Sequence, residues 1–303
     1  MKFHHTYWLA AATSFLPGSV DAAGGLRSSD HPDRHLQGNG NGNGNKKSCV
    51  ILLKKIHFDD NTEKDEIDCY ADMKYNRLSA DLEEKVKKDM KEGKVKSGST
   101  TMNADGSYGI DGDGRRVLHV SDVDSIIYED FVPNHDHGRS LAVLGTKEML
   151  AIRVKAADAT TTASKAEISD SWFGTDGDAV NLKSQYAACS YGALTCNAAS
   201  MTTSTGVDVT DGVYEVTISE NVSGADNNVI KNAVVAAGDA ALGNMQSQFD
   251  HVMLCLPSGT NSGWIAYAYV NWYLSVYNNN WCNYVSAQMH GELSSYTTLT
   301  FLL

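Results

Sequence analysis

Residues 264–290 read "WIAYAYVNWYLSVYNNNWCNYVSAQMH", and the two parts of this stretch predict different elements. Its first part, from Trp264 to Tyr277, is rich in aromatic and small apolar residues and predicts buried strand and loop. The following polar run favours a final helix that starts near Tyr284 and reaches His290. After His290 the sequence changes to a Ser, Thr and Leu tail with poor helix propensity.

Helix and strand patterns alternate upstream of this stretch. Strands are predicted over 148–156, 192–197, 212–222 and 249–257, and helices over 162–174, 178–192 and 227–248. This alternation predicts an α/β (α+β) domain over residues 148–290. We expect a twisted sheet of four or five strands, with 150–156 and 250–256 in the same sheet and a long helix within 228–248 packed on it.

The N-terminal region divides into three parts. Residues 1–22 have the layout of a secretory signal peptide cleaved after Ala22, although a disordered N-terminus is the alternative. Residues 23–45, which include "GNGNGNGN", read as a flexible linker. Residues 46–147 predict a small α+β region: a strand over 48–58, a helix that starts after Ser79 and ends near Gly93, and hairpins over 99–145.

The charge distribution limits the classes of partner. The net charge is −12, and from Ala156 to the end of the chain 3 basic residues stand against 13 acidic ones. Such a surface cannot neutralise phosphates, so we expect no nucleic acid partner and no binding to anionic membranes. Residues 264–277 are too short for a membrane span, and Asn271 interrupts them.

The cysteines indicate an oxidising compartment. An even set in a chain with a signal peptide predicts disulfides among Cys49, Cys69, Cys189, Cys196, Cys255 and Cys282. We expect the local pairs 49–69, 189–196 and 255–282, although the sequence alone does not decide among the possible pairings. Asn221 begins an Asn-Val-Ser acceptor for N-glycosylation, which fits secretion.

Several segments carry a resemblance to a known family. They are "KAEISDSWFGTDGDAVNLKSQYAACSYG", "YEVTISENVSGADNN", "FDHVMLCLPSG" and "WIAYAYVNWYLSVYNNNWCNYVSAQMH". Over residues 163–290 the chain resembles the gametolysin-like zinc metallopeptidases, a metzincin-type branch that degrades extracellular matrix. The resemblance implies a metzincin-like twisted mixed sheet with packed helices, a zinc cofactor, secretion, and matrix or cell-wall proteins as substrates. It also gives residues 46–147 the place of a propeptide, and therefore implies a zymogen.

The family continues from the position of His290 as HExxHxxGxxH. Two histidines four residues apart bind zinc from one helical face, the Glu activates the metal-bound water, and a glycine turn brings in a third histidine. This chain matches only the first histidine. The remaining positions of the motif hold Gly291 for Glu, Ser294 for His, Thr297 for Gly and Thr300 for His.

His290 is therefore interpreted as an orphan zinc ligand, where an isolated histidine would otherwise be read as a surface or core residue. Glu292 does not replace the missing general base, because one residue turns a helical side chain by about 100°. We expect the motif to be truncated, the tail 291–303 to lie outside the family, and the chain as written to lack zinc-dependent proteolysis. If the exon ends one base after the His290 codon, at a splice donor GTGAGT encoded within Gly291-Glu292-Leu293, the tail would be translated intron.

Two functions from different classes follow. The first is a secreted zinc metalloendopeptidase with a truncated catalytic motif. The second is a secreted non-catalytic relative that binds matrix components. The aromatic residues of 264–284 fit either a binding platform or the core, and the alternation of Trp264, Tyr267 and Tyr269 with small residues favours the core. Cys69 has a further alternative role, as a thiolate that blocks the metal of a zymogen, although we favour its disulfide with Cys49.

Overall fold

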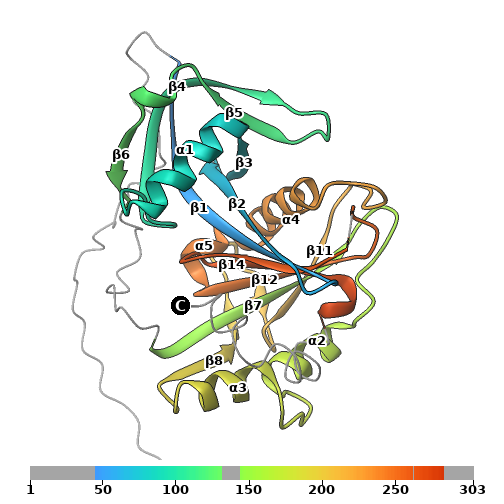
Figure 1. The fold of residues 1–303 in the computed structure, drawn as a ribbon. Helices are drawn as coiled ribbons and strands as arrows, with labels where there is room; N and C mark the ends of the chain where they lie inside the picture. Colours follow the sequence, from blue (N-terminus) through green and yellow to red (C-terminus); the bar gives the residue numbers. More distant parts are fainter. Residues whose placement is uncertain (1–44, 132–143, 262, 283–303) are drawn as a thin grey trace, which may run out of the picture. The chain divides into compact units, whose positions relative to one another are not determined.

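The sheet of the C-terminal half is organised around the strand β7 (Gly145–Lys155). β12 (His251–Leu256) pairs with β7 in parallel along one edge, and β11 (Val213–Thr217) and β8 (Leu194–Ala198) pair with it in parallel along the other. Beyond β12 lie β14 (Leu274–Asn278), which is parallel to it, and β13 (Trp264–Tyr269), which is antiparallel to β14. This computed structural model describes residues 45–131, 144–261 and 263–282, which belong to one compact unit (Figure 1).

The long helix α4 (Asn227–Leu242) covers one face of this sheet. Its apolar side chains share a core with the even-numbered residues of β7, which are Leu150, Ile152 and Val154. Gly243, with φ of 80°, ends α4, and a separate short helix α5 (Met245–Gln248) follows. The helix predicted over 227–248 is therefore correct in position but is broken at this glycine.

Two shorter helices, α2 (Lys165–Phe173) and α3 (Leu182–Cys189), cover the opposite face. The odd-numbered residues Met149 and Ala151 of β7 belong to the core on this side, as the two-residue period of a strand requires. Ser164 begins α2 with a capping box, because its hydroxyl accepts from the Glu167 amide and the Glu167 carboxylate accepts from the Ser164 amide. The C-terminal half is thus a sheet between two helical layers.

Residues 46–131 form a closed barrel, the N-terminal barrel. Its strands are β1 (Lys46–Phe58), β2 (Glu63–Ala71), β3 (Lys74–Leu78), β4 (Thr100–Ile110) and β5 (Arg116–Val120). β1 pairs with β2, β2 with β3, β3 in parallel with β5, and β5 with β4, which returns to the first residues of β1. The helix α1 (Ala80–Lys91) connects β3 to β4, and β6 (Ile127–Asp130) adds to β4 after a 3-10 turn at Val123–Ser125.

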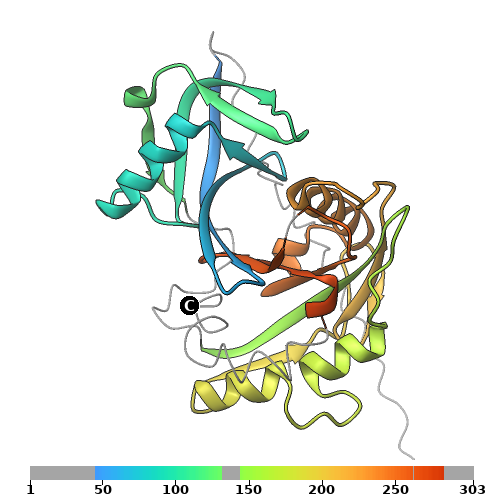
Figure 2. The same cartoon turned by 45° about the vertical axis from the view of Figure 1, so that its right-hand side comes forward.

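β1 belongs to both parts of the molecule. Its first residues pair with β4 in the barrel, and Lys54 to Phe58 pair antiparallel with β13 of the C-terminal sheet. Figure 2 shows the blue strands β1 and β2 running from the barrel to the C-terminal sheet. Within the described ranges, one 12-stranded sheet therefore connects the N-terminal barrel to the C-terminal half, and a separate hairpin joins β9 (Met201–Thr202) to β10 (Asp208–Val209).

The sheet-rich α+β architecture agrees with the broad fold class expected from the sequence, but the expected sheet of four or five strands is wrong, because six strands of the C-terminal half join a larger sheet. The helix in 228–248 and the shared sheet of 150–155 and 251–256 are both confirmed. The strands β2 and β3 were not predicted, because their charged residues hide the alternation. In β2, Ile67 and Cys69 point into the barrel core, while Glu66 and Asp68 are buried on the other side. The boundaries proposed at residues 22, 45, 147 and 290 stay predictions.

Candidate functional site

The segment that leads to the predicted metal-binding helix begins where β14 ends. The chain makes a 3-10 turn at Asn279–Trp281, and the described part stops at Cys282. The motif positions lie outside the described residues: His290, Gly291, Ser294, Thr297 and Thr300. The structure therefore defines the approach to the predicted site.

Residues in α2 and in the segment before it hold this approach in place. The indole Nε1 of Trp172 in α2 donates a hydrogen bond of 2.7 Å to the carbonyl oxygen of Cys282, and its ring packs 5.3 Å from that of Tyr277. The amide and the hydroxyl of Thr162 both donate to Oδ1 of Asn279, at 2.8 Å each. Trp172 and Asn279 are buried, so the exit of the chain from β14 is fixed by packed groups.

Two buried thiols lie at the same place. The Cys282 thiol hydrogen-bonds with that of Cys255 in β12 and lies 3.8 Å from the carbonyl oxygen of Tyr277. Burial, together with the Cys255 contact, raises the pKa of Cys282 well above its usual value. Burial also raises the pKa of Cys196 to about 11. Both thiols are therefore protonated at neutral pH.

The described residues do not form a zinc site. Among the residues that the structure describes, no group of three or more His, Cys, Asp and Glu could hold a metal ion. His251 Nε2 is 2.8 Å from the Ser275 hydroxyl, and burial lowers the pKa of His251 to about 4. His57 pairs with Glu63 at 3.1 Å in the β1–β2 hairpin. The sequence that follows contributes His290 alone where the family motif has three histidines.

The aromatic residues of 264–282 form core and not a surface platform. The buried members of this group are Trp264, Tyr267, Tyr269, Trp272, Tyr273 and Tyr277. Trp281 is partly buried against the core on the α2–α3 side. The interpretation of this cluster as core is confirmed for these residues, whereas Tyr284 lies outside the described part.

The comparison with known families covers this same part of the chain. Residues 150–298 match the family model described as gametolysin peptidase M11. This part of the chain is gametolysin-like. The matched region begins in β7, includes every later strand of the C-terminal sheet, and extends past His290. The family is one of zinc metallopeptidases, so its members hydrolyse proteins and zinc is expected for them. No curated protein and no solved structure matches the chain.

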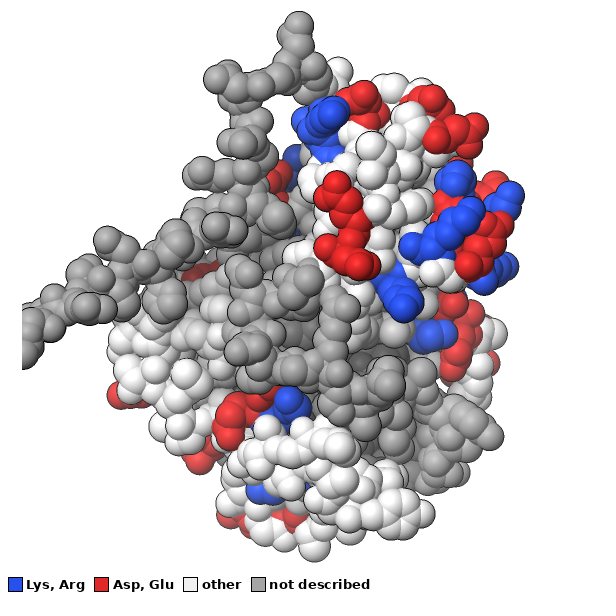
Figure 3. Space-filling model, turned by 90° about the vertical axis from the view of Figure 1, so that its left-hand side faces the viewer, with Lys and Arg blue, Asp and Glu red and all other residues white. Residues whose placement is uncertain are grey.

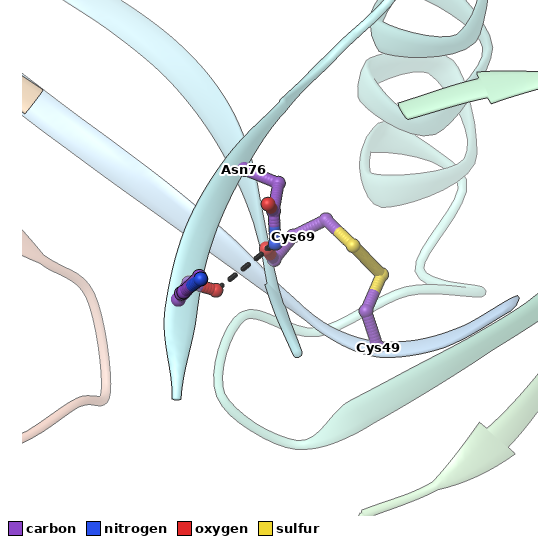
Figure 4. Close-up of a disulfide and its surroundings, with 4 residues drawn as sticks. Cys49, Cys69 and Asn76 are labelled. Carbon is purple, nitrogen blue, oxygen red and sulfur yellow. Dashed lines mark hydrogen bonds between the residues drawn. A yellow bond between two sulfur atoms is a disulfide. The ribbon is translucent and has the colours of Figure 1, made fainter. Parts of the chain in front are cut away.

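The disulfide predicted between Cys49 and Cys69 is present in the N-terminal barrel. It joins β1 to β2 across a Cα–Cα distance of 5.4 Å, and Nδ2 of Asn76 in β3 donates to the Cys69 carbonyl (Figure 4). This bond rules out the alternative role of Cys69 as a thiolate that blocks a metal. The predicted pairs 189–196 and 255–282 are not formed in this structure, in which Cys189 is an exposed free thiol and Cys196, Cys255 and Cys282 are buried free thiols.

Other features of the gametolysin-like chain bear on its partners. Asn221, the predicted glycosylation site, is exposed in the loop between β11 and α4. No helix in the described ranges is long and apolar enough to cross a membrane. Over the N-terminal barrel, Lys and Arg side chains are intermixed with Asp and Glu (Figure 3). The described residues of this face therefore show charges of both signs and no single-sign basic patch.

Sequence reasoning missed the residues that position the approach to the site. Trp172 was recognised as part of a helix, but its bond to Cys282 depends on two segments 110 residues apart. Asn279 looked like one of several loop asparagines. The signal that singles it out is its place directly after a strand, where a buried amide must find partners.

Proposed function

We propose that the C-terminal half is the peptidase domain of a secreted gametolysin-like metalloendopeptidase whose substrates are extracellular matrix or cell-wall proteins. The family match over residues 150–298 carries this proposal. A metzincin-like course, in which β14 leads into the metal-binding helix, fits the anchored exit at Cys282.

Secretion is supported by three independent features. They are the signal-like residues 1–22, the disulfide between Cys49 and Cys69, and an exposed glycosylation acceptor at Asn221. Expression in a secreting host tests this part of the proposal. We expect a secreted product whose first residue is Ala23, and a product retained inside the cell with Met1 intact would contradict secretion.

We further propose that the chain as written has no zinc-dependent proteolytic activity. One imidazole cannot supply the roughly 10 kcal/mol or more with which several ligands together hold structural zinc. Gly291 also has no side chain to act as the general base. The proposed inactivity rests on the residue types at the motif positions and not on the length of the chain.

The assay uses the purified full chain with added zinc, a gelatin substrate, and parallel reactions with a chelator. We expect no difference between the two reactions. Chelator-sensitive cleavage would contradict the proposed inactivity. The transcript across the His290 codon gives a second test, since a spliced form that encodes Glu at position 291 and two further histidines would make the spliced product the enzyme.

The second candidate is a non-catalytic protein that binds matrix components through the same fold. The residue types at the motif positions favour it, because Gly291 and Ser294 stand where the family has Glu and His. A pull-down of the full chain on gelatin or cell-wall protein, without proteolysis, separates the two candidates. Saturable retention without cleavage supports the binding protein, whereas no retention contradicts it.

A further inference from the structure

The N-terminal barrel has the strand connections of a known binding fold. Five strands close in the order β1, β2, β3, β5, β4, with β3 parallel to β5 and α1 between β3 and β4. This is the arrangement of OB-folds, small Greek-key barrels that bind ligands on the outer face of their second and third strands. The question is therefore what the outer face of β2 and β3 contacts in this chain.

Aromatic residues of this outer face lie against the C-terminal half. The ring of Tyr75 in β3 stacks on that of Tyr269 in β13 with centroids 4.9 Å apart. Tyr70 in β2 meets the edge of Trp272 at 5.3 Å, and Nε1 of Trp272 donates to the Tyr75 hydroxyl at 3.1 Å. Asn232 of α4 donates through Nδ2 to the backbone carbonyl of Tyr75 at 3.1 Å. The binding face of the barrel is thus covered by protein.

A buried ionic cluster lies beside these rings, and both parts contribute to it. The barrel supplies Lys54, Glu66 and Asp68, and the C-terminal half supplies Lys231 of α4 and Tyr269. Lys54 Nζ is 2.6 Å from a Glu66 oxygen and 3.8 Å from Asp68, while Lys231 Nζ is 3.7 Å from Asp68. Lys231 also donates to the Tyr269 hydroxyl at 2.5 Å, and that hydroxyl donates to Asp68 at 2.6 Å.

The cluster is closed to solvent and is completed by contacts from both sides. The side chains of Lys54 and Lys231 are both 0% exposed, and each donates to Oδ1 of Asn228 in α4. Burial opposes the charge of Glu66, but Lys54 and other cations outweigh it and hold the pKa of Glu66 below its usual range. Charges buried in this way are stable only while their partners remain, which ties Asp68 of one part to Lys231 of the other.

The third contact is a shared sheet and a shared core. Lys54 to Phe58 of β1 pair with β13, which without β1 would be the edge strand of the C-terminal sheet. Alternate residues of β1 face the two interiors: Cys49 and Ile51 face the barrel core, whereas Val50, Leu52 and Ile56 join the core of the C-terminal half. Separation of the two parts would expose this apolar surface and the β13 edge to water.

We propose that the N-terminal barrel is a resident binding module whose ligand is the C-terminal half of the same chain, and that the two stay bound when the connection between β6 and β7 is cut. Cleavage in this connection would then not release residues 46–131 as a propeptide. The inference goes beyond the proposed function and does not depend on catalysis.

The test cuts the folded protein and asks whether the fragments separate. A recognition sequence for a site-specific protease is placed within residues 132–143 of the full chain, and the purified protein is cleaved. We expect both fragments to elute together from a size-exclusion column at about 1 μM and to separate only in denaturant. Elution of the N-terminal fragment as a separate species under native conditions would overturn the proposal.

A matched pair of variants tests the contact itself. Asp68→Asn removes a buried charge of the cluster, and Asp65→Asn makes the same change at an exposed position of the same strand. We expect Asp68→Asn to raise the dissociation constant of the cut complex at least about tenfold, and Asp65→Asn to change it by less than about twofold. Equal values for the two variants would overturn the proposed interface. If Asp68→Asn does not fold, the elution of the cut unsubstituted protein alone tests whether the two parts stay bound.

Discussion

The N-terminal barrel and the C-terminal half close their interiors by different means. The barrel encloses one small core, and the disulfide between Cys49 and Cys69 lies inside it. The C-terminal half packs helices on both faces of its sheet, and its buried cysteines Cys196, Cys255 and Cys282 are free thiols. Small domains bury a smaller fraction of their surface on folding than large ones do. The comparison indicates that the barrel depends on a covalent link and on its partner, and the C-terminal half on packing.

The largest effect is expected at the core of the C-terminal half. Trp172→Ala removes a fully buried indole and its bond to the Cys282 carbonyl, and should cost about 3–5 kcal/mol of unfolding free energy. Urea unfolding measures the loss. Trp281→Ala, at a partly buried position, is the control and should cost clearly less. Similar losses for the two variants would show that the buried indole of Trp172 contributes no more to the unfolding free energy than a partly buried indole does.

The second prediction concerns the contribution of the disulfide to the stability of the barrel. Cys49→Ala combined with Cys69→Ala opens a loop with a sequence separation of 20 residues and should cost about 3 kcal/mol. Cys196→Ala, at a buried free thiol, should cost about 1 kcal/mol, since it removes only one small buried group. If thermal unfolding shows the double variant at Cys49 and Cys69 to be more stable than Cys196→Ala, the barrel does not depend on its disulfide.

The cluster between the two parts gives a prediction about pH. Burial, which outweighs the attraction of Asp68, lowers the pKa of Lys231 to about 7. In the unfolded chain the pKa of a lysine is about 10.4, so between these values the unfolded state holds the extra proton and stability rises with pH. Below pH 7 both states hold it, and this dependence vanishes.

Lys231→Met should therefore flatten the rise in unfolding free energy between about pH 7.5 and 9.5, where one proton contributes at most about 1.4 kcal/mol per pH unit. The charged groups that face Lys231 are Asp68, Glu66 and Asp226, which raise its pKa, and Lys54, which lowers it. Urea unfolding at several pH values gives the two slopes. Equal slopes for Lys231→Met and the unsubstituted protein would contradict the lowered pKa of Lys231 in the folded protein.

The smallest expected effects concern one helix start in each part. Ser164 caps α2 through a capping box, whereas Ser79 at the start of α1 makes no capping bond through its side chain. Ser164→Ala should cost about 1 kcal/mol and Ser79→Ala less than about 0.5 kcal/mol. Thermal unfolding measures both, and the reverse order would contradict the assigned caps.

The sequence predicted local elements better than it predicted how the two parts combine. The strand at 48–58, the helix after Ser79 and the helix in 228–248 follow from periodicity and capping residues that lie close together in the chain. The pairing of β1 with β13 joins residues more than 200 positions apart, and periodicity has no information about it. Lys54 and Lys231 look like surface residues in a sequence, because their burial depends on partners from distant segments.

The candidate site shows the same limit. The resemblance to the family identified the positions of the zinc motif, and the residue types at 291, 294, 297 and 300 then predicted that the motif is incomplete. The anchoring of the approach by Trp172 and Asn279 required the fold, since each bond joins segments more than 100 residues apart.

Zinc binding by the folded full chain is the direct test of the incomplete metal motif. The chain as written is compared with a variant that restores the motif through Gly291→Glu, Ser294→His, Thr297→Gly and Thr300→His. After equilibration with zinc and dialysis against a weak chelator, we expect well below one zinc per molecule in the chain as written and about one in the variant. Tight stoichiometric zinc in the chain as written would contradict the proposed loss of the metal site.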